Sequence, residues 1–186
     1  MFININMNMP LTSSTSQESL LSKDDFIQII ESIDITPILE YYHSIESDIK
    51  WTNYGHKGKQ AGIQYLSGQD PWSGAVGRSQ GKELEYDQLN PYFSGTIFEQ
   101  IVDKFKFKRT RLMWVGSNSC YSMHTDSTPR VHIPLITNAE CYFVFKNGVP
   151  SHLSTGFVWY TNTTLPHTFM NCSENPRLHL VGAIEK

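Results

Sequence analysis

The chain has 186 residues, of which 39% are hydrophobic and 12% aromatic, as expected for a folded domain with a sizeable core rather than a disordered segment. Its formal net charge of −3 argues against general binding to nucleic acids or membrane surfaces, which requires an excess of basic residues. The three cysteines have no metal-binding spacing, and their odd number disfavours a disulfide framework. Because no apolar run is long enough to span a membrane and no signal-peptide pattern is present, we expect a soluble, cytoplasmic protein.

The composition divides the chain into an arm and one domain. Residues 1–21 are rich in Asn, Ser, Thr and Met and have no sustained hydrophobic period, so we expect a mobile N-terminal arm. Residues 22–186 contain recurrent apolar patterns and are expected to fold as a single domain. No internal repeat is present, and the sequence does not specify an oligomeric state.

Three amphipathic helices are expected in the first half of the chain. Ser22 is a suitable N-cap for the first, Thr36-Pro37 is a typical start for the second, and the third follows a turn at Asn90-Pro91. Because each has its apolar residues on one side, we expect the helices to pack on the outside of a sheet. The apolar faces are Phe26, Ile29, Ile30 and Ile33 in the first helix, Ile38, Tyr41 or Tyr42, Ile45 and Ile49 in the second, and Ile97, Phe98, Ile101, Val102 and Phe105 in the third.

After position 106 the pattern changes from helices to short strands. One or two earlier strands are expected at 51–66, around a Gly-containing turn in KGKQAG, and loop 67–82 is either a lid over a site or a surface connection. Asn147-Gly148 is typical of a type I′ hairpin turn. Helices followed by regularly spaced strands predict an α+β chain with a jelly-roll core, the double-stranded β-helix of cupins, and N-terminal helices outside it. The expected strands are KRTRLMWVG, RVHIPLIT, CYFVF, GFVWY, HTFMN and RLHLVGAI.

Two histidines and one carboxylate in the strand-rich half are candidate metal ligands. His124 and Asp126 have the i, i+2 spacing that places both side chains on one face of an extended strand. His167 lies on a separate segment, after the GFVWY strand. Two imidazoles and one carboxylate are typical of non-haem Fe(II) sites that react with O2. The alternative for His167 is a hydrogen-bonded core histidine, in which case His179 is a second candidate ligand.

Arg177 stands among apolar residues in RLHLVGAI, ten positions after His167. A buried guanidinium without a partner is unfavourable, and arginine can bind a carboxylate through two parallel hydrogen bonds. We therefore expect an anionic partner for Arg177. The alternatives are an internal Asp or Glu partner, or a side chain that reaches solvent.

The segments HTDSTPRVHIPLITN, GFVWY and PHTFMNCSENPRLHLVG resemble the aspartyl/asparaginyl β-hydroxylase branch of the 2-oxoglutarate oxygenases, from about Arg109 to the C-terminus. The resemblance implies that His124 and His167 bind the metal. Some members have Gly where Asp126 stands, so the metal-binding triad is complete here. It also implies that Arg177 binds the distal carboxylate of 2-oxoglutarate.

An R-x-H motif that helps to hold 2-oxoglutarate belongs to the same family pattern, and Arg130 and His132 match it. The implied activity is hydroxylation of an unactivated C–H bond by Fe(II), 2-oxoglutarate and O2. The implied substrate is an Asp, Asn or other side chain of a protein or peptide, or a small molecule. Two alternatives are a metal-dependent cupin-type enzyme, which has no need of Arg177, and a non-catalytic jelly-roll binding module, which needs no metal.

Overall fold

The computed structural model describes residues 26–54, 58–74, 82–146 and 148–185. The expected N-terminal arm, the N-cap at Ser22, much of loop 67–82 and Asn147 of the expected hairpin turn lie outside the described residues. The arm, the loop and the hairpin turn therefore stay predictions.

An antiparallel seven-stranded sheet, here called the major sheet, organises the molecule, with strand order β1-β10-β8-β12-β6-β3-β2. Its strands are β1 Ile27–Ser32, β10 Phe157–Thr161, β8 Arg130–Ile136, β12 Arg177–Ala183, β6 Lys108–Val115, β3 Gly58–Gly62 and β2 Thr52–Tyr54. A three-stranded sheet of order β7-β11-β9 and a two-stranded sheet of β4 and β5 complete the β-structure described. Their strands are β7 Ser119–Cys120, β11 His167–Asn171, β9 Cys141–Phe145, β4 Gln64–Tyr65 and β5 Gln88–Leu89.

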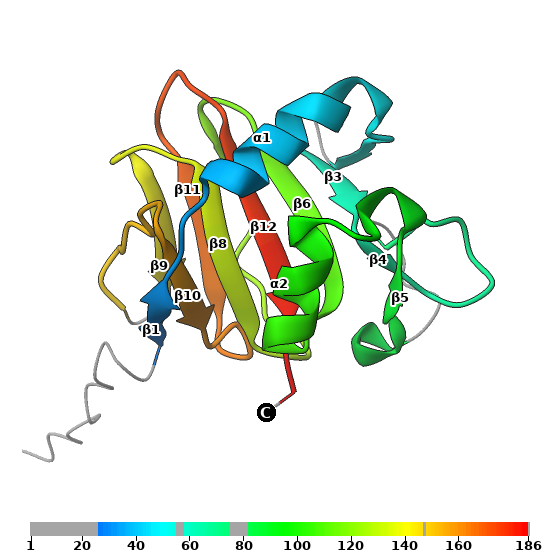
Figure 1. Ribbon diagram of the computed structural model, residues 1–186. Coiled ribbons are helices and arrows are strands. Elements are labelled where there is room, and N and C mark those ends of the chain that lie inside the picture. Colours follow the sequence, from blue (N-terminus) through cyan, green and yellow to red (C-terminus); the bar gives the residue numbers. More distant parts are fainter. Residues whose placement is uncertain (1–25, 55–57, 75–81, 147, 186) are drawn as a thin grey trace, which may run out of the picture.

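Two α-helices lie across one face of the major sheet, in front of β8, β12 and β6 in Figure 1. They are α1 Thr36–Ile45 and α2 Ile97–Phe105, and the short 3-10 helices are η2 Glu46–Asp48, η3 Glu83–Glu85 and η4 Pro91–Phe93. Buried side chains of both helices, including Ile38 and Phe98, join one core with Leu112 of β6 and Leu180 of β12. The expected second and third helices are therefore confirmed. Among the described residues, no helix has the length and apolarity needed to cross a bilayer.

The first expected helix is wrong, because its residues form the edge strand β1, paired with β10. Phe26 is buried against Phe145 in a second core, whereas Ile29 and Ile30 are 51% and 46% exposed. Isoleucine is β-branched and favours strands, and pairing with β10 outweighs the helical spacing of these residues. The Gly-containing turn expected in KGKQAG is also wrong, because residues 58–62 form β3.

Side chains alternate between the two faces of the major sheet. In β8 and β12, Ile133 and Leu180 belong to the core under the helices. His132 and His179 point to the opposite face, called the inner face below, where their rings contact Phe143 of β9 and Phe169 of β11. The inner face therefore packs against the three-stranded sheet and carries polar side chains. The two layers and all six expected late strands confirm the jelly-roll core.

Candidate metal centre

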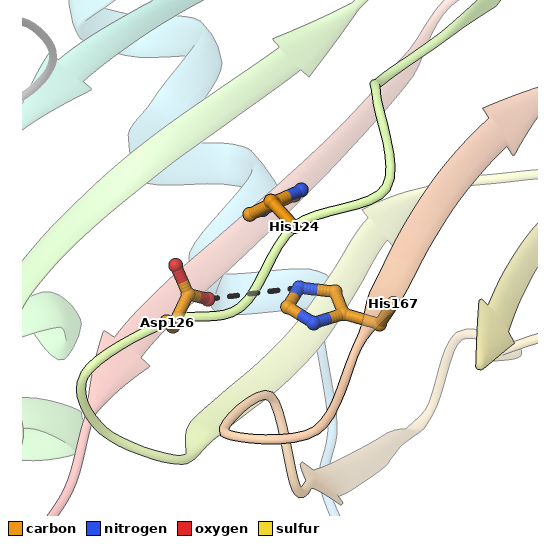
Figure 2. A group of neighbouring side chains, drawn as sticks. All are labelled: His124, Asp126 and His167. Atoms are coloured by element: carbon orange, nitrogen blue, oxygen red, sulfur yellow. Dashed lines mark ion pairs between the residues drawn. The ribbon is translucent and has the colours of Figure 1, made fainter. Parts of the chain in front are cut away.

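The three candidate ligands His124, Asp126 and His167 meet at one point (Figure 2), where their ligand atoms all lie within 4.8 Å of one another. Backbone pairing brings them together. His124 and His167 exchange two N–H···O=C hydrogen bonds of 2.9 Å, and the amide of Asp126 donates to the carbonyl of Thr163 at 2.8 Å. The cluster is thus built into the fold and does not depend on attraction between the side chains.

Hydrogen bonds orient both imidazoles. Nδ1 of His124 lies 2.8 Å from the carbonyl oxygen of Ser122, and Nδ1 of His167 lies 2.9 Å from that of Leu165. Each Nδ1 therefore carries the proton and donates it, which leaves Nε2 with a lone pair. Burial lowers the pKa of His167, which favours the neutral ring that a metal requires. Its Nε2 lies 3.7 Å from Oδ2 of Asp126.

The second oxygen of Asp126 is held by Arg130, whose Nη2 lies 3.3 Å from Oδ1. Arg130 is itself held by Glu83 of η3, with 2.6 Å between Nη1 and Oε2, and by the hydroxyl of Thr128. Burial raises the pKa of Glu83, but the nearby charges of Arg130 and Arg111 and the hydrogen bond from Thr128 more than offset it, giving a pKa of about 2. Glu83 is therefore an ionised, buried carboxylate.

Two further arginines lie close to the carboxylate of Glu83. Nη1 of Arg109 lies 2.8 Å from Oε1, and Nη1 of Arg111 lies 3.7 Å from the same atom. Burial, together with the charges of Arg130 and Arg109, lowers the pKa of Arg111 to about 9. This cluster cannot be predicted from the sequence, because a glutamate among polar residues carries no signal for burial.

Arg177 lies elsewhere on the inner face, 2% exposed, with its guanidinium carbon 3.5 Å from the centre of the Phe169 ring. Its Nη2 lies 2.5 Å from Nδ1 of His179. Among the described residues no carboxylate lies within 4 Å of Arg177, and its Nε has no hydrogen-bond partner. Neither an internal acidic partner nor contact with solvent, the two alternatives from sequence, is found in this part of the chain.

His132 and His179 complete the surroundings of Arg177. Their Nδ1 atoms are 3.5 Å apart, and the buried Nε2 of each lacks a hydrogen-bond partner within the described ranges. Burial and the charge of Arg177 hold the pKa of both rings well below the ordinary value, so both are neutral. His179 thus lies between Arg177 and His132, whereas Arg130 contacts Asp126 and Glu83.

Comparison with known proteins shows the family. Residues 30–186 match the model of the aspartyl/asparaginyl β-hydroxylase family. The match covers most of the chain, so the chain belongs to this family of enzymes. The resemblance seen in HTDSTPRVHIPLITN and PHTFMNCSENPRLHLVG is therefore confirmed.

Two proteins are similar to this chain, one in sequence and the other in fold. An L-proline cis-4-hydroxylase of Rhizobium meliloti (strain 1021) is 30% identical over 97 residues, which are 49% of this chain and 34% of the relative. The chain thus spans about a third of the length of this relative. HygX of Streptomyces hygroscopicus, solved with nickel, 2-oxoglutarate and hygromycin B bound, superimposes with a TM-score of 0.51 at 11% identity, covering 86% of this chain and 82% of HygX. At this identity the likeness shows the fold.

Proposed function

We propose that the protein is an Fe(II)- and 2-oxoglutarate-dependent dioxygenase that hydroxylates an unactivated C–H bond. The observation that carries the proposal is the convergence of His124, Asp126 and His167, with both Nδ1 atoms bound to carbonyls. Family membership supports hydroxylation as the reaction. The nickel and 2-oxoglutarate bound to HygX, which has a similar fold, support the choice of cofactor and cosubstrate.

The donor set fits iron(II). Two neutral imidazole nitrogens and one carboxylate oxygen on one side of a metal leave positions for a two-atom cosubstrate chelate and O2. When bound, iron and 2-oxoglutarate supply the oxidation: O2 converts 2-oxoglutarate to succinate and CO2 and gives one oxygen atom to the substrate C–H bond. Arg130 lies beside Oδ1 of Asp126, so Oδ2 would be the oxygen available to a metal. Phe143 stacks on the His167 ring at 5.2 Å and excludes water from that side.

Arg177 fits the distal carboxylate of 2-oxoglutarate. Its Nε and the Nε2 atoms of His132 and His179 are buried nitrogens that lack partners among the described residues. Nε of Arg177 is a donor, and so is Nε2 of His179, because Nδ1 of that ring accepts from Arg177. Leaving a buried donor unpaired costs about 1–3 kcal/mol, so a carboxylate bound by these two groups would recover that free energy. The resemblance assigns Arg130 to 2-oxoglutarate as well, and that role remains a prediction beside its contacts with Asp126 and Glu83.

The proposed substrate is a side chain of a protein or peptide, as the family description suggests, or a small molecule, as the proline hydroxylase suggests. Loop 67–82 is a candidate cover for it. No membrane or nucleic-acid partner forms part of the proposal.

The test is anaerobic addition of Fe(II) and 2-oxoglutarate, followed by air. We expect a weak visible charge-transfer band and then release of succinate. His124→Ala should lose the band and iron binding, whereas His43→Ala, on the exposed side of α1, should keep both. Turnover that needs metal without 2-oxoglutarate would favour the cupin-type enzyme, and a protein that binds no metal would favour the binding module.

A further inference from the structure

Glu83 of η3 lies at the centre of a buried network that reaches the candidate metal centre. Its side chain is only 5% exposed, and its Oε1 lies 2.8 Å from Nη1 of Arg109. Its Oε2 lies 2.6 Å from Nη1 of Arg130 and accepts hydrogen bonds from the hydroxyls of Ser127 and Thr128, at 3.1 and 2.8 Å. Donors of the protein itself therefore satisfy both oxygens, as a buried carboxylate requires.

Three of these partners belong to the segment that carries Asp126. Ser127, Thr128 and Arg130 follow Asp126 along the chain, and the hydroxyl of Thr128 also accepts from Nη1 of Arg130 at 2.6 Å. Glu83 comes from a different element, η3, far away in the sequence. A residue from outside the segment therefore fixes the chain just beyond a candidate metal ligand.

Strand β6 fixes the position of η3 in turn. The amide of Arg109 donates to the carbonyl of Tyr86, directly after η3, at 2.7 Å, and the Arg109 guanidinium carbon lies 5.4 Å from the centre of the Tyr86 ring. The φ of Arg109 is 47°, in the left-handed region that favours glycine. Such strain in a non-glycine residue persists only where the surroundings impose it, and it is concentrated at functional sites. The strain at Arg109 therefore points to a role for this network beyond stability.

Arg130 connects Glu83 to Asp126 through its two terminal nitrogens. Nη1 faces Glu83, whereas Nη2 lies 3.3 Å from Oδ1 of Asp126. The guanidinium fork of an arginine can bind both oxygens of one carboxylate through parallel hydrogen bonds. Without Glu83, both nitrogens of Arg130 could turn to Asp126 and compete with a metal for both of its oxygens. Glu83 therefore determines how much of the Asp126 carboxylate remains available.

The charge of Glu83 acts in the same direction. Arg109, Arg111 and Arg130 all lie within 4 Å of its carboxylate, and their side chains are largely buried. Without Glu83, these three guanidinium groups would repel a divalent cation bound at the nearby Asp126, with little screening by solvent. The negative charge of Glu83 offsets part of that repulsion.

We propose that Glu83 is a positioning residue of the metal centre: it holds Arg130 so that the guanidinium takes one oxygen of Asp126 and leaves the other to the metal. The proposal rests on the proposed function, because it requires a metal at His124, Asp126 and His167. Replacing a residue that holds a metal ligand typically changes metal affinity by roughly 10- to 100-fold. A purely structural Glu83 would instead stabilise the fold and leave metal affinity unchanged.

The test measures nickel affinity by calorimetry in folded protein, without turnover. Glu83→Gln keeps the size of the side chain and removes its charge, so we expect nickel affinity to fall by roughly 10- to 100-fold. Glu83→Asp keeps the charge on a shorter side chain and should restore part of the affinity. Circular dichroism and unfolding temperatures establish that each variant is folded at the temperature of the titration.

Two controls separate positioning from stability. Ile38→Ala truncates a fully buried side chain of α1 on the other face of the major sheet, so it should lower stability without changing nickel affinity. The second control combines Glu83→Gln with Arg130→Met. Because Glu83 acts through Arg130, its replacement should weaken nickel binding much less in this background than in the presence of Arg130.

Three results would overturn the proposal: wild-type nickel affinity in folded Glu83→Gln, an equal loss of affinity in Ile38→Ala, or an undiminished effect of Glu83→Gln in the Arg130→Met background. If Glu83→Gln does not fold, Thr128→Val replaces it, because it removes the hydroxyl that bonds both Glu83 and Arg130. An unchanged nickel affinity in Thr128→Val would then overturn the proposal. A wild-type protein that binds no nickel is a different outcome, because it contradicts the proposed function itself.

Discussion

The two oxygens of the Asp126 carboxylate face different partners, because Oδ1 lies 3.3 Å from Nη2 of Arg130 and Oδ2 lies 3.7 Å from Nε2 of His167. Arg130 is fixed in turn by Glu83. A carboxylate held by one oxygen presents the other in a defined direction. Glu83 thus acts on the candidate metal centre through Arg130, without contact with the ligands themselves.

The first prediction concerns Glu83→Gln. Glutamine has a similar size but no charge, so three largely buried arginines would lose their shared counter-ion. Removing one partner of a buried ion pair costs about 3–5 kcal/mol, and we expect a loss of that order in the free energy of unfolding measured in urea. The matched control is Glu40→Gln on the exposed side of α1, which should change little. Equal stability of the two variants would show that the cluster does not depend on Glu83.

The second prediction is the acid dependence of stability. The pKa of Glu83 is about 2 in the folded protein, below its ordinary value of 4.5, so the unfolded chain binds a proton more readily. The stabilisation is therefore complete above about pH 5 and is lost as the pH falls towards 2, by about 3 kcal/mol for this group. Urea unfolding between pH 2 and 6 measures it. In Glu83→Gln this contribution to the slope should disappear; an unchanged slope would place the acid sensitivity in other carboxylates.

Sequence was informative where a local spacing encodes the structure. The i, i+2 spacing of His124 and Asp126 identified two residues that the fold brings to His167, and the alternation in the late strands identified the jelly roll. The sequence did not predict elements whose structure depends on pairing with a strand far along the chain. Strand β1 is an example, because its isoleucines have helical spacing but the segment pairs with β10. Glu83 was missed for the same reason, since its partners lie far along the chain and its neighbours are polar.

The third prediction tests whether Arg177 binds 2-oxoglutarate. Arg177→Met keeps much of the side-chain volume over Phe169 but removes the charge, so affinity for 2-oxoglutarate should fall by roughly 10- to 100-fold. Anaerobic titration of the Fe(II) protein with 2-oxoglutarate measures the loss. Nickel affinity should not change, because Arg177 does not contact the three candidate ligands within the part of the chain described. Unchanged affinity for 2-oxoglutarate would refute the assignment of Arg177.

The fourth prediction concerns metal binding and folding. The bound metal would join residues 124–126 to His167, two segments that backbone hydrogen bonds also link. A ligand that binds only the folded state stabilises it by about 2.7 kcal/mol when present at 100 times its dissociation constant. Nickel should therefore raise the unfolding temperature, and a chelator should reverse the rise. His167→Asn should fold without the metal-dependent rise, because asparagine lacks the imidazole Nε2. A full rise in that variant would mean that the metal binds elsewhere.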